Sequence, residues 1–359
     1  GLQTLFTQNA GAEAYNVAVG FQAGTSITTG INNVMMGGLA LDALTTADGI
    51  TAVGYAAGGA LTTGTGNTLF GHQAGLVLTT HESNSIFGYN AGIALVESNN
   101  VIMGRNAAKA ATSANGNVII GDAAVDTGVL TGDNNVVIGK LAGQDMTSAF
   151  DCTFIGETAG QNITTGRSNI AIGKSALYQP DTEQHNLAIG AVALGGVIAG
   201  GEYNVAIGNY TLDALTSADG TTAIGYNAGT ALTSGSVCTI VGYLAGDSIT
   251  TGTKNSVFGA ETGGAITTGY NNTIIGAENA GTLTTGNGNI VLGKGANVSV
   301  AAATFQFVIG DGVTGNGNST TTIGYDTTEI ATAHGSASWA AVSDERYKKD
   351  ITDSTAGLT

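Results

Sequence analysis

Two pairs of carboxylates are the residues in this sequence whose spacing most readily suggests catalysis. Asp42 and Asp48 lie in the segment LDALTTADGITAVGYAAG, and Asp213 and Asp219 lie in the similar segment LDALTSADGTTAIGYNAG. Two carboxylates about 5 to 9 Å apart in a cleft can hydrolyse a glycoside. Both pairs, however, fall in short segments of uniform length, without an insertion that could build a cleft. We therefore expect these side chains to cap solvated turns, with a polysaccharide depolymerase as a less favoured alternative.

The histidines give no sign of a metal or cofactor site. They are scattered along the chain, at positions 72, 81, 185 and 334. No phosphate-binding loop or nucleophile elbow accompanies them. We predict that the protein uses no metal and no cofactor.

A glycine that ends a short apolar run recurs throughout the sequence. It stands at positions 20, 37, 54, 71, 88, 104, 121, 139, 156, 173, 190, 208, 225, 242, 259, 276, 293, 310 and 324. Fourteen of the eighteen intervals share the same 17-residue length, which is too short for a helical-pair or propeller-blade repeat and matches one coil of a solenoid. We therefore predict an all-β fold, a parallel β-solenoid (β-roll) with 17-residue coils.

The residues before this glycine form columns in the repeat. The residue one position before it is large and apolar in almost every coil, as at Val19 and Ile155, and we expect this column to fill the core. The residue three positions before it shares that face, by the two-residue period of a strand. The column two positions before it, on the opposite face, is apolar as well, as at Leu69 and Phe154. Since one coil can bury only one face, the second face predicts association of identical chains, and we expect a homotrimeric fibre.

Three further columns support the coil. Alanine stands three residues after the glycine in fourteen of the seventeen turns from Gly20 to Gly293, which predicts a tight turn. Threonine stands eight residues after it in twelve of those turns and predicts a second short strand. Asparagine stands four residues before it in thirteen of the nineteen turns. We expect these asparagines to hydrogen-bond from coil to coil as a ladder.

Both cysteines stand in the asparagine column. Cys152 and Cys238 are five coils apart, or roughly 23 Å at about 4.7 Å per coil, which excludes a disulfide within the chain. If this column faced the axis of an oligomer, the same cysteine of neighbouring chains would come together. The alternative is a small buried apolar residue.

Composition and charge exclude several classes of protein. The chain has 58 Gly but one Pro and no three-residue period, which excludes collagen. Its formal charge of -16 and its lack of a basic stripe argue against nucleic-acid binding. Apolar runs of three to five residues fall far short of the roughly 20 needed to cross a bilayer, so we expect no membrane insertion.

The repeat resembles a known family. The motifs N-V-A-V-G at 16–20, N-I-A-I-G at 169–173 and N-V-A-I-G at 204–208, with the following Ala and T-T-G, look like the head repeats of trimeric autotransporter adhesins. This resemblance covers residues 16–324 and implies a left-handed parallel β-roll trimer. Bacteriophage tail fibres resemble the same pattern.

The composition changes abruptly at residues 343–351, S-D-E-R-Y-K-K-D-I. By itself this segment predicts the start of a helix, with Ser343 as N-cap. It also resembles the opening of the intramolecular chaperone domain of endosialidases and of phage tail spikes and fibres. That resemblance implies a trimeric domain that guides folding of the preceding fibre and then releases itself by autoproteolysis with a Ser and a Lys, which match Ser343 and Lys348. In a regular helix these two would lie about 140° apart, so a bent segment or a neighbouring chain must pair them.

These observations divide the chain into four parts. They are an N-terminal connection (1–15), a solenoid rod (16–324), a transition segment (325–342) and the incomplete start of a chaperone domain (343–359). We expect a structural and host-receptor-binding segment of a phage tail fibre, located on the virion and in contact with other tail proteins. Apart from self-cleavage near Ser343 in a full-length precursor, we predict no enzyme. The alternatives are the head of a trimeric adhesin on a bacterial surface and, less favoured, an ice-binding solenoid built on the threonine column.

Receptor contacts are expected where aromatic side chains follow the recurring glycine, or near the single tryptophan. The candidates are Tyr55, Tyr89, Tyr226, Tyr243 and Trp339. Exposed aromatic side chains suit glycans or protein loops on a host cell surface. Ordinary surface filling is the alternative for each of them.

Overall fold

The structure, a computed structural model, describes residues 1–9, 13–336 and 340–342. The chain divides into two compact units, Gly1–Ile224 and Gly225–Thr359, and each is described by itself. The described residues form strands, turns and bends, with no helix among them. The predicted all-β fold, a parallel β-solenoid with 17-residue coils, is confirmed.

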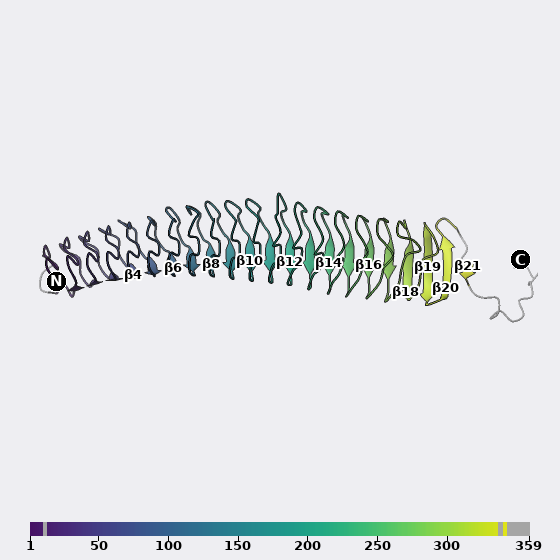
Figure 1. Ribbon diagram of the computed structural model, residues 1–359, viewed down its shortest axis with the longest axis horizontal. Coiled ribbons are helices and arrows are strands. Elements are labelled where there is room, and N and C mark those ends of the chain that lie inside the picture. The colour runs from purple at the N-terminus through teal and green to yellow at the C-terminus, as the bar shows by residue number, and fades with distance from the viewer. Residues whose placement is uncertain (10–12, 337–339, 343–359) are drawn as a thin grey trace, which may run out of the picture. The chain divides into compact units, whose positions relative to one another are not determined.

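In the first unit each coil contributes one three-residue strand. Successive strands pair in parallel and in register, so that Val17 lies opposite Val34 and Thr153 lies opposite Ile170. Figure 1 shows these strands side by side, one to a coil. They are β1 (Val17–Val19), β2 (Val34–Met36), β3 (Thr51–Val53), β4 (Thr68–Phe70), β5 (Ser85–Phe87), β6 (Val101–Met103), β7 (Val118–Ile120), β8 (Val136–Ile138), β9 (Thr153–Ile155), β10 (Ile170–Ile172), β11 (Leu187–Ile189), β12 (Val205–Ile207) and β13 (Thr222–Ile224).

The second unit is built of the same coils and ends in antiparallel strands. Strands β14 to β19 pair in parallel, whereas β20 runs antiparallel to β19, and β21 runs antiparallel to β20 (yellow in Figure 1). Described residues of the segment 325–342 thus form a β-meander with the last coil. The strands are β14 (Thr239–Val241), β15 (Ser256–Phe258), β16 (Thr273–Ile275), β17 (Ile290–Leu292), β18 (Phe307–Asp311), β19 (Thr320–Tyr325), β20 (Thr328–Ala333) and β21 (Ala340–Val342).

The recurring glycine marks a close approach between neighbouring coils. Gly54 has a φ of +140°, and a Cβ there would lie 2.2 Å from the carbonyl oxygen of Gly71, its equivalent in the next coil. Any other residue would combine a strained φ with a clash against the backbone. Glycine therefore recurs with the coil because the stacking leaves no room for a side chain.

The core lies on the strand face opposite to the one predicted. In every strand from β2 to β17 the middle residue is buried and its two neighbours are half-buried or exposed. Phe154 is fully buried, whereas Ile155, which we expected in the core, is 36% exposed. Residues two and four positions before the glycine lie on the same face of the strand. The asparagine column, four positions before it, is buried, so the residue two positions before it is buried as well. Both apolar columns look alike in the sequence, so the buried asparagines alone distinguish them.

Small residues across the coil make room for the large side chains of the strands. The alanines three positions after the glycine, such as Ala57 and Ala159, are fully buried, as the predicted tight turn requires. A Cβ at Gly160 would lie 2.6 Å from the ring of Phe154, so this glycine accommodates the ring. The interior of each coil is thus packed without space for further atoms.

The predicted asparagine ladder is confirmed. Asn117, which is fully buried, donates its backbone N–H to Oδ1 of Asn100 (3.0 Å). Its own Oδ1 accepts the backbone N–H of Asn135 (2.8 Å), and its Nδ2 donates to the carbonyl of Gly132 (3.2 Å). The side chain therefore satisfies backbone groups of neighbouring coils that would otherwise be buried without partners.

The two cysteines replace asparagines in this ladder. The N–H of Cys152 donates to Oδ1 of Asn135 (3.0 Å), and its Sγ donates to the carbonyl of Gly166 (3.4 Å). Cys238 donates to the carbonyl of Gly252 at 3.3 Å. Burial raises the pKa of the Cys152 thiol to about 11, so the thiol stays protonated. Both thiols are buried inside their own coils, so this column does not face outward, which was the condition for cysteines of neighbouring chains to meet. The alternative of a small buried residue holds.

The threonine column forms a hydrogen-bonded ladder but no strand. Thr62 lies in a bend, and both its N–H and its Oγ1 donate to the carbonyl of Thr79 in the next coil (2.8 and 3.1 Å). The second short strand predicted here is therefore wrong. The Thr-Thr-Gly segment turns the chain, and turn geometry outweighs the strand preference of threonine.

The coil pattern also reaches the described residues 1–9. The N–H of Gln22 donates to the carbonyl of Leu2 (3.0 Å), and the N–H of Asn9 donates to the carbonyl of Thr28 (2.7 Å). A Cβ at Gly1 would lie 2.2 Å from the carbonyl oxygen of Gly20, the same approach that the recurring glycines make. Residues of the segment named as an N-terminal connection (1–15) thus stack as part of a coil.

Candidate receptor-binding surface

Aromatic side chains that follow the recurring glycine form two stacks on the surface. Tyr55, His72 and Tyr89 stack in three consecutive coils, with ring centroids 5.3 and 5.0 Å apart. In the second unit Tyr226 and Tyr243 stack at 5.7 Å. The four tyrosines are 44% to 52% exposed. The structure therefore pairs Tyr226 with Tyr243 and places Tyr55 and Tyr89 on either side of His72.

His72 belongs to the first stack and to the column after the recurring glycine in which receptor contacts were expected. Its signal in the sequence is its position, one coil period after Tyr55 and one coil period before Tyr89. In a solenoid of 17-residue coils this spacing places all three side chains in one column. The coil period thus identifies members of a surface cluster that residue type alone does not.

The stacking decides which parts of the rings can contact a ligand. Neighbouring ring planes are inclined by 23° and 18° in the first stack and by 15° in the second. Because neighbouring rings cover each other's faces, the accessible surface consists mainly of ring edges and tyrosine hydroxyls. Such a row suits hydrogen bonds and edge contacts better than the stacking of a sugar on an open ring face.

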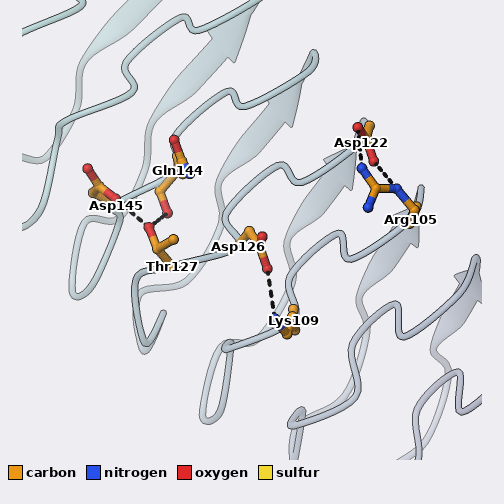
Figure 2. Close-up of polar contacts among 7 residues, drawn as sticks. All are labelled: Arg105, Lys109, Asp122, Asp126, Thr127, Gln144 and Asp145. Carbon is orange, nitrogen blue, oxygen red and sulfur yellow. Dashed lines mark hydrogen bonds and ion pairs between the residues drawn. The ribbon is translucent and has the colours of Figure 1, made fainter.

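Charged side chains occupy equivalent columns in other coils of the first unit. Arg105 and Asp122, which also follow the recurring glycine, form an ion pair with an N–O distance of 2.9 Å. Lys109 and Asp126, five positions after it, lie 3.8 Å apart, and Figure 2 shows both pairs joining neighbouring coils. Exposed ion pairs contribute about 0 to 1 kcal/mol each. These ion pairs therefore add little to the stability of the stacked coils. Their main effect is to make this part of the surface charged.

On the outward face of the strands, the column directly before the glycine is apolar in each unit, whereas the column three before it mixes apolar residues with Thr and Ser. Phe70 and Phe87 stack on this face with their centroids 6.2 Å apart. Further large apolar residues exposed on this face are Val17, Val19, Met36, Val101, Met103, Ile170 and Ile224 in the first unit and Phe258, Ile275 and Ile290 in the second. These residues stand one and three positions before the recurring glycine, the two columns that we expected to fill the core.

A shallow depression of about 490 Å³ lies at the antiparallel end of the second unit. Phe305 and Ile290 line its apolar side, and Thr321 and His334 line its polar side. Nε2 of His334 lies 3.3 Å from Oγ1 of Thr321. Sequence reasoning missed this feature, because His334 reaches it through the antiparallel strand β20, which no repeat predicts.

Two of the four carboxylates considered for catalysis, Asp48 and Asp219, accept backbone N–H groups. Oδ1 of Asp48 accepts the N–H of Ile31 (2.7 Å), and Oδ1 of Asp219 accepts the N–H of Glu202 (2.9 Å), in each case one coil earlier. These two aspartates cap turns, as expected.

Three of the predicted site residues, Trp339, Ser343 and Lys348, lie outside the described residues. Within residues 1–9, 13–336 and 340–342, no three His, Cys, Asp or Glu side chains come close enough together to hold a metal ion. In that same part of the chain no helix is long and apolar enough to cross a membrane.

Comparison with known proteins does not place the chain in a family. No protein-family model matches it, and no curated protein sequence matches it. The adhesin and chaperone resemblances therefore remain expectations from the sequence motifs.

Proposed function

We propose that this chain is a structural and receptor-binding segment of a phage tail fibre that assembles as a homotrimer. The observation that carries the proposal is the apolar outward face of the strands. It repeats from coil to coil in each unit, and no part of the described chain covers its exposed members. A face of this kind marks a surface for association.

Self-association explains this face better than chance exposure does. Val19 is 55% exposed and Phe70 is 52% exposed, although both belong to strands. A second copy would present the same column with the same spacing, so apolar side chains of identical chains would meet along the whole repeat. The number of three chains follows from the resemblance to trimeric adhesin heads.

Host contact is assigned to the two aromatic stacks and to Trp339. Tyr55 and Tyr89, with His72 between them, offer hydroxyls and ring edges to a glycan or a protein loop on the host cell surface. Because the coil backbone stays constant while this column varies, a receptor site can change without a change of fold.

The C-terminal proposal rests on the sequence motif alone. Residues 343–351 would begin a chaperone domain that guides trimer folding and then cleaves itself, with Ser343 as nucleophile and Lys348, in its neutral form, accepting the serine proton. A full-length precursor that carries Ser343→Ala should stay uncleaved in a denaturing gel. Unchanged processing of that precursor would exclude the role of Ser343.

Sedimentation equilibrium of the purified chain tests the assembly. We expect three times the chain mass for the wild type, and monomers for the double variant Phe70→Glu, Phe87→Glu, which buries two charges in the interface. The control is Thr63→Glu, Thr80→Glu, which adds the same charges at exposed positions of the same two coils. A monomeric wild type, or equal dissociation of both variants, would contradict the assembly.

Binding to host cells tests the receptor role separately. The trimer should bind cells, and Tyr55→Ser with Tyr89→Ser should weaken binding while the trimer persists. Absence of cell binding by the wild type would exclude the receptor role and leave the assembly untouched.

A further inference from the structure

A depression of about 320 Å³ on the first unit combines one carboxylate with aliphatic walls. Asp42 stands at one side, Leu76 and Val77 at the other, and Ala56, Gly59 and Ala60 form the floor. The depression exists because the coil in the middle carries only small side chains where its two neighbours carry larger ones. Its width is two coil steps, or about 10 Å.

Gly59 keeps the carboxylate of Asp42 accessible from the floor. A Cβ at Gly59 would lie 3.4 Å from Oδ1 of Asp42 and 3.2 Å from Cδ1 of Leu76, so any side chain there would fill the depression. Burial raises the pKa of Asp42, and hydrogen bonds from its own N–H and that of Ala43 partly offset this effect. The surrounding protein therefore removes part of the water from this carboxylate.

Part of this arrangement recurs in the second unit: an aspartate and a glycine are present, but Gly281 and Thr282 stand where the first depression has Leu76 and Val77. Leu244, Asp247, Glu261 and Gly264 line a depression of about 250 Å³, and a Cβ at Gly264 would lie 3.2 Å from Oδ1 of Asp247. In both units an aspartate five positions after the recurring glycine is followed, one coil period later, by a glycine. Burial raises the pKa of Asp247 as it does that of Asp42.

The lining selects the chemistry of a ligand. The first depression offers a carboxylate acceptor, and the N–H of Ala60 on its floor is already donated to the carbonyl of Leu76 (3.0 Å). A ligand must therefore bring donors for one carboxylate and apolar C–H groups for Leu76 and Val77. Ca²⁺ and Mg²⁺ take six or more oxygen ligands, and an ammonium group has three N–H donors to satisfy, whereas this lining supplies one carboxylate. A sugar unit has adjacent hydroxyls on one edge and C–H groups on its face.

We propose that the depression beside Asp42 binds a single neutral sugar unit, with two ring hydroxyls donating to the carboxylate and the C–H face against Leu76 and Val77. The depression beside Asp247 shares the aspartate and the glycine but lacks the aliphatic wall, and it is a second, partial subsite. The inference rests on the proposed receptor role and specifies its ligand as a glycan. It adds a contact surface distinct from the tyrosine stacks.

The test uses a panel of neutral methyl glycosides, namely hexoses, deoxyhexoses and N-acetylhexosamines, and the purified full chain. Saturation-transfer NMR and titration up to about 10 mM detect the millimolar affinity expected of one sugar unit. Asp42→Asn with Asp247→Asn should weaken binding about tenfold or more, because a charged acceptor is replaced by a neutral one. Gly59→Leu with Gly264→Leu should abolish it by filling both depressions.

The matched control is Asp126→Asn, with thermal unfolding of every variant recorded to confirm the fold. Asp126 stands in the same column, but the next coil carries Gln144 there, and Lys109 pairs with its carboxylate. Its substitution should leave glycoside binding unchanged. No binding of any glycoside by the wild type, or equal affinity of the folded Asp42→Asn, Asp247→Asn variant, would overturn the proposal. If the wild-type chain binds host cells but no glycoside, the sugar subsite is excluded and the receptor role stands. If the wild-type chain does not bind host cells, the receptor role is excluded.

Discussion

The two faces of each strand have similar residues and opposite roles. Phe154 and Ile155 are neighbours in β9, yet Phe154 is fully buried and Ile155 is exposed on the outward face. The inward face meets small residues and the asparagine ladder, whereas outward residues pack only along their own face, as Phe70 does on Phe87, and stay half-buried or exposed. The coil therefore depends on its inward face, and its outward face is available for assembly.

The largest effect should come from the glycine that sets the stacking distance. Gly71 has a φ of +141°, and a Cβ there would lie 2.3 Å from the carbonyl oxygen of Gly88. Gly71→Ala should cost more than about 4 kcal/mol of unfolding free energy, measured by urea denaturation. Gly49→Ala is the control, because Gly49 also has a positive φ (+68°) but a Cβ there would meet no atom within 4 Å. That variant should cost about 1 kcal/mol. Equal costs for the two variants would show that backbone strain, not the close approach of the coils, causes the loss of stability.

The neighbouring pair in β9 tests the two faces directly. Phe154→Ala should cost about 3 to 5 kcal/mol, because it leaves a cavity above Gly160. Ile155→Ala should cost less than about 1 kcal/mol in the isolated chain, because this side chain is already partly in water. Urea denaturation of dissociated chains measures both. The reverse order would place the core back on the outward face.

The asparagine ladder should be next in size. Asn117→Leu removes the acceptor for the N–H of Asn135 and the donor to the carbonyl of Gly132, and should cost about 2 to 4 kcal/mol. Asn117→Cys should cost less, because cysteine occupies this column at 152 and 238 and keeps a weak donor. Thermal unfolding of the two variants compares them, and an equal loss would mean that side-chain volume matters more than hydrogen bonding.

The smallest effect should be a dependence of stability on pH, caused by carboxylates that are partly buried at the coil surface. Burial raises the pKa of Asp42, Asp247 and Glu329 above the ordinary values. As the pH falls from neutral, the folded state takes up these protons before the unfolded state does, so their contribution to stability increases until the pH reaches about 4. The melting temperature should therefore rise in mild acid, and Asp42→Asn with Asp247→Asn should reduce that rise. A melting temperature that falls steadily from pH 7 to 5 in both proteins would contradict this.

The sequence predicted what the period controls. The glycine spacing predicts the coil, and the recurrence of asparagine predicts the ladder, because stacking brings equivalent residues together. It did not predict which strand face is inward, since Ile155 and Phe154 are both large and apolar. Phe154 shares its strand face with the asparagine column, but only the structure shows that these asparagines are buried.

Features that depart from the 17-residue period were harder to predict from the sequence. Thr62 has a strand-forming side chain, but its place in a turn follows from the need to close the coil. The antiparallel strand β20 and the position of His334 beside Thr321 depend on a pairing that no repeat encodes. For the sugar subsite, Asp42 and Gly59 were visible one coil period apart, yet their meaning required knowing that both positions face outward at the same corner of the coil.

The cysteine at position 152 has a mechanical consequence. The ladder bonds of the first unit run from one coil to the next, so a force that pulls the coils apart loads all of these contacts in series, and the weakest yields first. Between β9 and β10 the side-chain donor is a thiol, 3.4 Å from the carbonyl of Gly166, where Asn169 in the next coil places an amide 2.7 Å from the carbonyl of Glu183. Position 50 of the same column is Ile50, whose side chain has no donor at all. Under tension the first unit should therefore open first at the coil of Ile50 and next at the step of Cys152.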